Sequence, residues 1–169
     1  MEIIELNQTE FEFASYIGLQ RGSHNLFANF APEYGADKIK GLFDFNCIGC
    51  CSELAVAKYL NCFWPTKQHD LLVPDVGGVV EVRSTPYADG FLRMHDKDKN
   101  QAPYVLALTY DLPKIYLVGW VLGSAGKDQK YWGDKWGNNR PAFWVPQSDL
   151  LPMSELKVRY DAWRNKKGA

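Results

Sequence analysis

The pattern of hydrophobic and polar positions predicts helices near both ends of the chain and strands between them. Residues 9–22 have helical spacing, which places Phe13, Tyr16 and Ile17 on one face. Gly22 is the expected end of this helix, since glycine commonly follows the last helical turn.

A second helix is predicted over residues 46–61, and Asn61 and Pro65 mark its end. The preceding residues, 23–45, contain a proline and two glycines, so we expect a loop with short helical turns there. The last predicted helices cover residues 148–151 and 154–167, with Ser148 and Ser154 as their N-caps.

Several extended runs lie between these helices, separated by segments rich in proline, glycine, aspartate and asparagine. They are a hairpin over 71–83 and single strands over 91–95, 104–110, 115–123 and 142–146. The order of helix, strands and helix predicts an α/β or α+β fold in which helices cover a sheet.

Composition limits the classes of function. The chain has 169 residues, of which 46% are hydrophobic and 23% charged, and this is ordinary for one globular domain. A net charge of −1 means that only a local basic patch or a bound cation could hold nucleic acid. With no secretory signal and no apolar run of membrane-spanning length, we expect a cytoplasmic protein without a membrane partner.

Glu53 stands out in the predicted helix over 46–61. Its neighbours on the same helical face are apolar or small, so its carboxylate is expected to be buried and to need a partner. One interpretation is an ion pair, with Arg83 as a candidate partner, that holds the helix on the sheet. The other interpretation is that Glu53 is a ligand of a cation.

Asp75 and Glu81 flank the glycine pair of the predicted hairpin. A three-residue turn at 77–79 would place their side chains opposite each other, whereas a two-residue turn would pair Asp75 with Val80. If the helix that carries Glu53 packs over this face, three carboxylates come together, and their repulsion is relieved either by a cation or by protonation of one of them. Oxygen-only ligands favour Mg²⁺ or Mn²⁺.

These residues carry a resemblance. PDVGGVVEVR (74–83) resembles the signature of the PD-(D/E)XK nuclease superfamily, and GCCSE (49–53) resembles the glycine–glutamate element that many members carry on the preceding helix. The helix SELAVAKYL, the hairpin PDVG…EVRS and the strand with GW also resemble uncharacterised phage-encoded proteins. The resemblance covers roughly residues 46–123 of the sequence.

The resemblance implies a restriction-endonuclease-like fold, a mixed central β-sheet flanked by helices, and a core of about residues 46–146. It implies hydrolysis of phosphodiester bonds in DNA, with RNA left open, and it allows a homodimer. Asp75, Glu81 and the Val82 carbonyl would hold Mg²⁺ or Mn²⁺, and Glu53 would bind the same or a second ion. If phage-encoded, the protein would act in the host cytoplasm.

Arg83 is a departure, because the superfamily usually has lysine at this position. Arginine keeps its proton and therefore grips phosphate instead of acting as a base. Either the metal alone prepares the water, or Lys58 or Lys67 reaches the site, or the protein is an inactive nuclease fold that binds nucleic acid or a protein partner.

Basic and aromatic residues suited to nucleic acid contact alternate between positions 127 and 140. With the helix lysine, the candidates are Lys58, Lys127, Lys130, Trp132, Lys135 and Arg140. A surface loop whose tryptophans cap the sheet explains the 127–140 pattern equally well. The four cysteines lack the spacing of a closed zinc site and are expected to be free thiols that pack as small hydrophobes.

Overall fold

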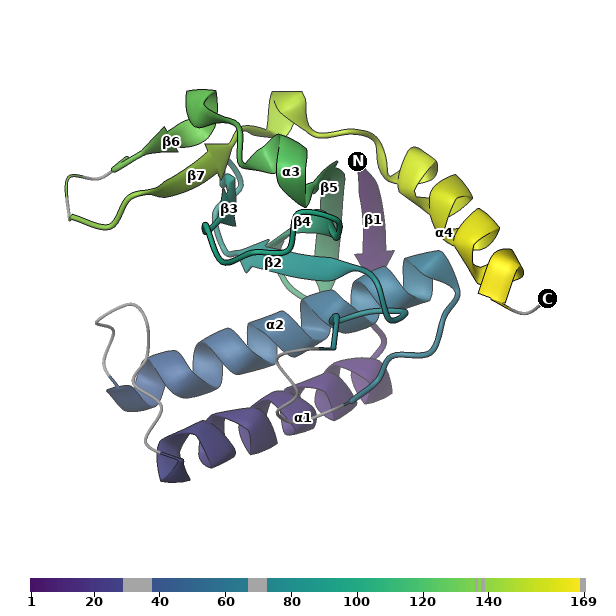
Figure 1. The fold of residues 1–169 in the computed structure, drawn as a ribbon. Helices are drawn as coiled ribbons and strands as arrows, with labels where there is room; N and C mark the ends of the chain where they lie inside the picture. Colours follow the sequence, from purple (N-terminus) through teal and green to yellow (C-terminus); the bar gives the residue numbers. More distant parts are fainter. Residues whose placement is uncertain (29–37, 67–72, 136, 138, 168–169) are drawn as a thin grey trace.

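A four-stranded mixed sheet forms the middle of the molecule (Figure 1), with strand order β1-β5-β4-β2. This computed structural model describes residues 1–28, 38–66, 73–135, 137 and 139–167. The strands are β1 (Glu2–Glu5), β2 (Glu81–Thr85), β4 (Pro103–Asp111) and β5 (Lys114–Leu122). β2 runs parallel to β4, and the other pairs are antiparallel.

Three helices cover one face of this sheet. They are α1 (Gln8–Phe27), α2 (Lys38–Leu60) and α4 (Met153–Lys167). α1 and α2 run antiparallel, side by side (Figure 1), and Gly18 allows a close approach, since a Cβ there would lie 2.5 Å from the Cys47 Cα. The predicted class, a mixed sheet flanked by helices, is confirmed.

A second sheet covers the opposite face. It is antiparallel, with order β3-β7-β6. Its strands are β3 (Leu92–Met94), β6 (Trp132–Gly133) and β7 (Ala142–Val145). A short helix α3 (Gly123–Gly126) and the 3-10 turn η1 (Gln129–Tyr131) connect β5 to β6, and η2 (Gln147–Asp149) follows β7.

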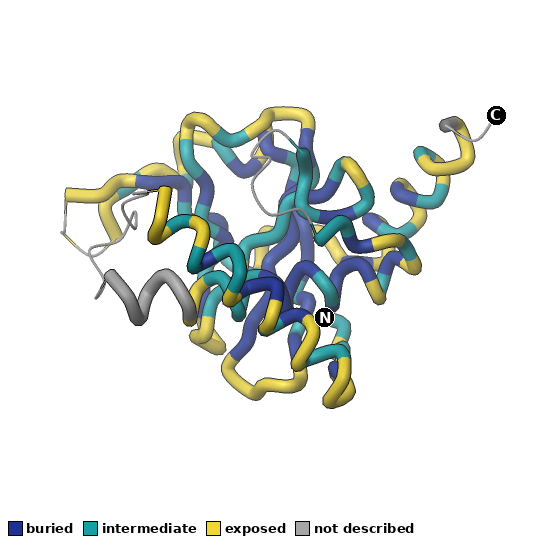
Figure 2. Tube along the Cα trace, turned by 90° about the horizontal axis from the view of Figure 1, so that it is seen from below, coloured by how far each residue is buried: buried dark blue, intermediate teal, exposed yellow. Residues whose placement is uncertain are grey.

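The two layers on either side explain the almost continuous burial of β4. Val105 and Ala107 point into the core beneath the helices, whereas Tyr104, Leu106 and Leu108 point into the core beneath the second sheet. Figure 2 shows these buried strands within a more exposed shell. A strand that is buried on both faces reads as an apolar run, as this one does.

The helical ends differ from their predictions. α1 continues through Gly22 to Phe27, because Gly22 is a buried packing position and not a terminus. Phe13 and Tyr16 are 49% and 56% exposed, and Ile17 is the buried member of the expected face. The prediction of a loop over 23–45 is wrong in the described part, because α2 begins at residue 38; residues 29–37 lie outside it.

The predicted N-caps are also wrong. Ser148 lies inside η2, whose N-cap is Pro146, and Ser154 lies inside α4, which begins at Met153. Asn61 was predicted correctly as the end of α2, and it adopts a positive φ of 52°. No helix in the described part of the chain has the length and apolarity needed to cross a membrane.

Candidate functional site

A three-residue turn precedes β2. Val76 and Val80 exchange two backbone hydrogen bonds of 3.0 Å and enclose residues 77–79. Gly77 and Gly78 supply the positive φ angles, 57° and 75°, that this turn requires. Of the predicted hairpin, residues 71 and 72 lie outside the described part, and the segment before the turn pairs only through this bridge in the described residues.

Asp75 and Glu81 face each other across this turn, as the three-residue register predicted. Asp75 Oδ2 accepts a hydrogen bond of 2.8 Å from the Val82 amide. Burial, and then the charge of Glu53, raise the pKa of Asp75 from 3.8 to about 6. Burial, and then the charge of Asp75, also raise the pKa of Glu81. This carboxylate pair is therefore short of positive charge.

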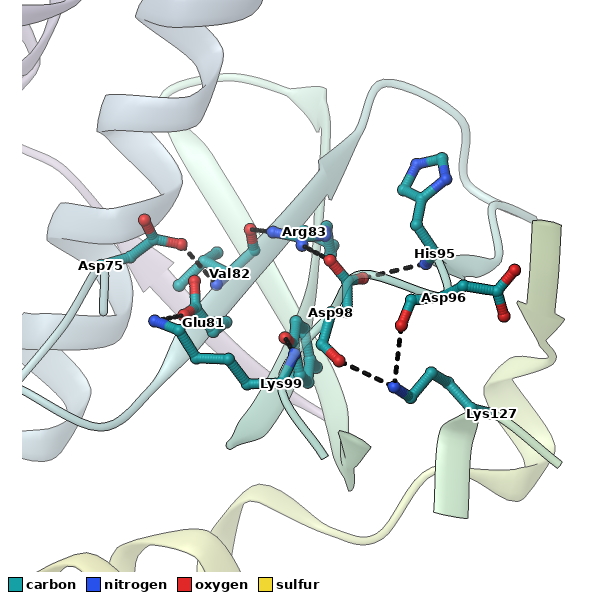
Figure 3. A network of polar contacts seen from close by, with 10 residues as sticks. Asp75, Glu81, Val82, Arg83, His95, Asp96, Asp98, Lys99 and Lys127 are labelled. Carbon is teal, nitrogen blue, oxygen red and sulfur yellow. Dashed lines mark hydrogen bonds and ion pairs between the residues drawn. The ribbon is translucent and has the colours of Figure 1, made fainter. Parts of the chain in front are cut away.

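Arg83 lies beside the pair on β2 (Figure 3). Its Nη1 donates to the Val82 carbonyl at 3.3 Å, and its Nη2 donates to Asp98 Oδ1 at 3.0 Å. The guanidinium also lies 5.1 Å from the centre of the Tyr104 ring. Burial lowers the pKa of Arg83, but the charges of Asp98, Asp75 and the other acidic groups around it together raise it more, and the pKa ends above its ordinary value. Arg83 is therefore a fixed cation.

Lys99 is the lysine that contacts this group. Its Nζ lies 3.1 Å from Glu81 Oε1, and its backbone amide donates to the Tyr104 hydroxyl at 2.8 Å. Lys58, one of the two lysines named as alternatives, contacts other groups instead: its Nζ lies 2.7 Å from Glu10 Oε2 and also donates to the Glu5 carbonyl. The other lysine named, Lys67, lies outside the described residues.

Glu53 is buried in α2, 6% exposed, as its place in the apolar stripe predicted. Its expected ion-pair partner was wrong. Arg21 of α1 binds both carboxylate oxygens, at 2.6 and 2.9 Å, and Trp64 Nε1 donates to Oε2 at 2.9 Å. Glu53 is therefore neutralised from the helical side, although its charge still reaches Asp75.

The expected metal site fits only in part. Among the described residues, no three His, Cys, Asp or Glu side chains are grouped so that they could hold a metal ion. Glu53 already accepts three hydrogen bonds, from Arg21 and Trp64, and therefore does not fit the role of a ligand. Asp75 and Glu81 do fit it, because they are adjacent hard oxygen donors whose raised pKa values a cation would relieve. The Val82 carbonyl, the third expected ligand, accepts from Arg83.

The predicted nucleic acid residues lie in three separate places. Lys58 is on α2, and Lys127 donates to the carbonyls of Asp96 and Asp98 at 3.1 and 2.7 Å. The other four lie on η1 and the β6–β7 hairpin: Lys130, Trp132, Lys135 and Arg140.

The hairpin group is not purely basic. Lys130 Nζ lies 3.6 Å from Asp149, and Lys135 lies over the Phe91 ring. Trp132 packs against Phe143 at 4.7 Å between ring centres, yet it is still 41% exposed. Both interpretations of this segment, nucleic acid contact and capping of the sheet, therefore remain predictions.

The cysteines are free thiols, as expected, and Cys50 and Cys51 are buried in the helical core. Burial raises the pKa of Cys50 and, to about 11, that of Cys51, so both thiols stay protonated at neutral pH. They are packing residues.

Sequence reasoning missed four site residues: Arg21, Trp64, Asp98 and Lys99. Arg21 had one available signal, since it follows Ile17 and Gly18 on the buried face of its helix by the helical period. Asp98 and Lys99 lie in a charged turn that reads as solvated surface in sequence, and only the tertiary fold brings it to β2.

No protein-family model, no curated protein and no solved structure matches this chain. The best indication of function is therefore the chemistry of Asp75, Glu81, Arg83 and Lys99.

Proposed function

We propose that this protein is a metal-dependent nuclease of the PD-(D/E)XK type that hydrolyses phosphodiester bonds in DNA. The observation that carries the proposal is the facing pair of Asp75 and Glu81, with raised pKa values, beside Arg83. Mg²⁺ is often bound by only one or two carboxylates together with substrate phosphates. When bound here, Mg²⁺ or Mn²⁺ would polarise the phosphate and lower the pKa of a water.

The cations of the site suit a phosphodiester. Arg83 uses two of its N–H donors on Val82 and Asp98, and a guanidinium has five, so donors are left for phosphate oxygens. Lys99 adds a second positive charge next to Glu81. Both groups would stabilise the charge that develops on the phosphate during cleavage.

The balance of charge indicates how the ion would bind. Glu53 is matched by Arg21, Glu81 by Lys99 and Asp98 by Arg83, so the negative charge of Asp75 is in excess. A divalent ion alone would give this group excess positive charge, whereas an ion with a phosphodiester would restore most of the balance. We therefore expect the ion to bind more tightly when nucleic acid is present.

A second candidate is a nuclease-like protein that binds nucleic acid or a protein partner without cleaving. The observation that favours it is the set of three hydrogen bonds from Arg21 and Trp64 to Glu53, which makes Glu53 unsuited to the role of a metal ligand. This candidate predicts binding of DNA without turnover in any metal.

The test is to incubate purified protein with linear, circular and single-stranded DNA, and with RNA, in Mg²⁺, Mn²⁺ or chelator. Cleavage that requires metal and is lost in Asp75→Asn and Glu81→Gln supports the nuclease. Asp111→Asn is the matched control, since Asp111 is an exposed carboxylate at the β4–β5 turn. Cleavage that survives both site variants would reject the site, and binding without cleavage would support the second candidate.

A further inference from the structure

Residues 95–99, called here the 95–99 turn, connect β3 to β4 and lie against Arg83 of β2 (Figure 3). The Asp98 amide donates to the His95 carbonyl at 3.0 Å, and the His95 amide donates to Asp98 Oδ2 at 3.0 Å. The Asp98 carboxylate thus closes the turn with one oxygen and holds Arg83 with the other.

The Asp98 carboxylate is buried, with its side chain 7% exposed. A carboxylate at that depth is costly unless charged or hydrogen-bonding partners compensate it. Arg83 is the charged partner, at 3.0 Å. Arg83 therefore stabilises the 95–99 turn, and Asp98 fixes the orientation of the Arg83 guanidinium.

Arg83 lies near more than one carboxylate. The charges of Asp98, Asp75 and Glu81 all act on its guanidinium, and Asp98 has the largest effect. Glu81 lies two residues earlier on β2, so both side chains project from the same face of the strand. Without Asp98, the guanidinium would turn toward Asp75 and Glu81 and neutralise them.

Lys127 holds the other side of the turn. It directly follows α3, and its Nζ donates to the backbone carbonyls of Asp96 and Asp98. An ammonium shared by two carbonyls fixes a turn that has no strand partner at these residues in the described structure. Lys127 was predicted to contact nucleic acid, but its contacts here are with the 95–99 turn.

We infer that Asp98 is a positioning residue that holds Arg83 away from Asp75 and Glu81, and that Lys127 is a positioning residue that holds the 95–99 turn in place for it. The inference rests on the proposed function, because an open carboxylate pair matters only if a cation and a phosphate use it. Its structural part, the orientation of Arg83, has a readout of its own.

The first measurement is NMR of the arginine side chains in ¹⁵N-labelled protein, with the Arg83 signals assigned by their loss in Arg83→Lys. We expect the Arg83 Nε and Nη chemical shifts to change in Asp98→Ala and in Lys127→Met, because the guanidinium exchanges Asp98 for Asp75 and Glu81, and to return toward those of the natural protein in Asp98→Glu. Lys130→Met is the matched control, because its partner is Asp149. Unchanged Arg83 signals in Asp98→Ala and Lys127→Met would overturn the inference.

The second measurement is Mn²⁺ binding, followed by electron paramagnetic resonance with a non-cleavable DNA present. We expect Asp98→Ala to weaken Mn²⁺ binding at least tenfold and the double variant Asp98→Ala with Arg83→Ala to regain most of it. A double variant as defective as Asp98→Ala would show a merely structural role and overturn the inference. If the natural protein binds no Mn²⁺, the proposed function fails, and the NMR measurement alone decides the role of Asp98.

Discussion

Arg21 and Glu53 form a two-point ion pair between α1 and α2, with N–O distances of 2.6 and 2.9 Å. Trp64 adds a third hydrogen bond to the same carboxylate. This pair lies close enough to the candidate site to affect it, because the charge of Glu53 contributes to the raised pKa of Asp75. A side chain of α1, a helix outside the sequence resemblance, thus contributes to the charge balance around Asp75.

Removing Arg21 is predicted to lower stability strongly. Arg21→Met leaves Glu53 buried without its cation, and breaking a buried pair from one side costs about 3–5 kcal/mol. The measurement is the free energy of unfolding in urea at pH 7. Lys157→Met is the control, because its exposed pair with Asp161 is expected to contribute less than about 1 kcal/mol. Equal losses in the two variants would contradict the assigned role of the Arg21–Glu53 pair.

Asp75→Asn is predicted to stabilise the protein at neutral pH. The folded pKa of Asp75, about 6, lies above its ordinary value of 3.8, so the protonated form suits the folded state better. Its contribution to stability is full below pH 4 and is lost as pH rises through about 6. An amide is neutral at every pH and can still accept from the Val82 amide.

The measurement for Asp75→Asn is the difference in unfolding free energy from the natural protein at pH 7.5 and pH 4. We expect a gain of about 1–3 kcal/mol at the higher pH that shrinks toward zero at the lower one. A variant that is less stable than the natural protein at pH 7.5 would show that Asp75 is not under electrostatic strain.

Lys99→Met is predicted to reduce cleavage about 10²-fold, because it removes a positive charge next to Glu81 that would stabilise the transition state. The readout is kcat on a defined DNA substrate in Mg²⁺. Lys58→Met serves as the control, since its contacts are with Glu10 and the Glu5 carbonyl. If the Lys58 variant loses more activity than the Lys99 variant, the assignment of the site lysine is wrong.

Gly77→Ala is predicted to cost about 1–3 kcal/mol of stability and to disturb the site. The residue has a φ of 57°, and an added Cβ would lie 2.5 Å from the Tyr160 hydroxyl oxygen. Thermal unfolding compares it with Gly133→Ala, where an added Cβ meets no atom within 4 Å. Similar melting temperatures for the two variants would argue against a strained turn.

The sequence predicts the strands better than the helical ends. β3, β4, β5 and β7 match their predicted ranges within one or two residues, because period-2 or continuous apolar runs bounded by turn residues leave few alternatives. β1 and β6 were missed, since strands of four and two residues carry too short a pattern. Gly22 was misleading because tertiary packing, and not local propensity, determined its role.

The same contrast holds for the site. The facing of Asp75 and Glu81 follows from the turn length alone, so local sequence could predict it. The partners of Glu53 and Arg83 could not be predicted, because Arg21 lies 32 residues before Glu53, and Asp98 lies 15 residues after Arg83 across a change of sheet. Charged residues so far apart in sequence become ion-pair partners only through the tertiary fold, which the local pattern of a single sequence does not reveal.

β2 is the last strand of its sheet, yet the amide and carbonyl of Val82 on its outer edge are both occupied. The Asp75 side chain takes the Val82 amide, and the Arg83 side chain takes the Val82 carbonyl. Unoccupied groups on a terminal strand invite pairing with a second chain and, eventually, aggregation. By covering Val82, the two side chains therefore protect this part of the strand edge from pairing with a second chain, independently of any role in the proposed chemistry.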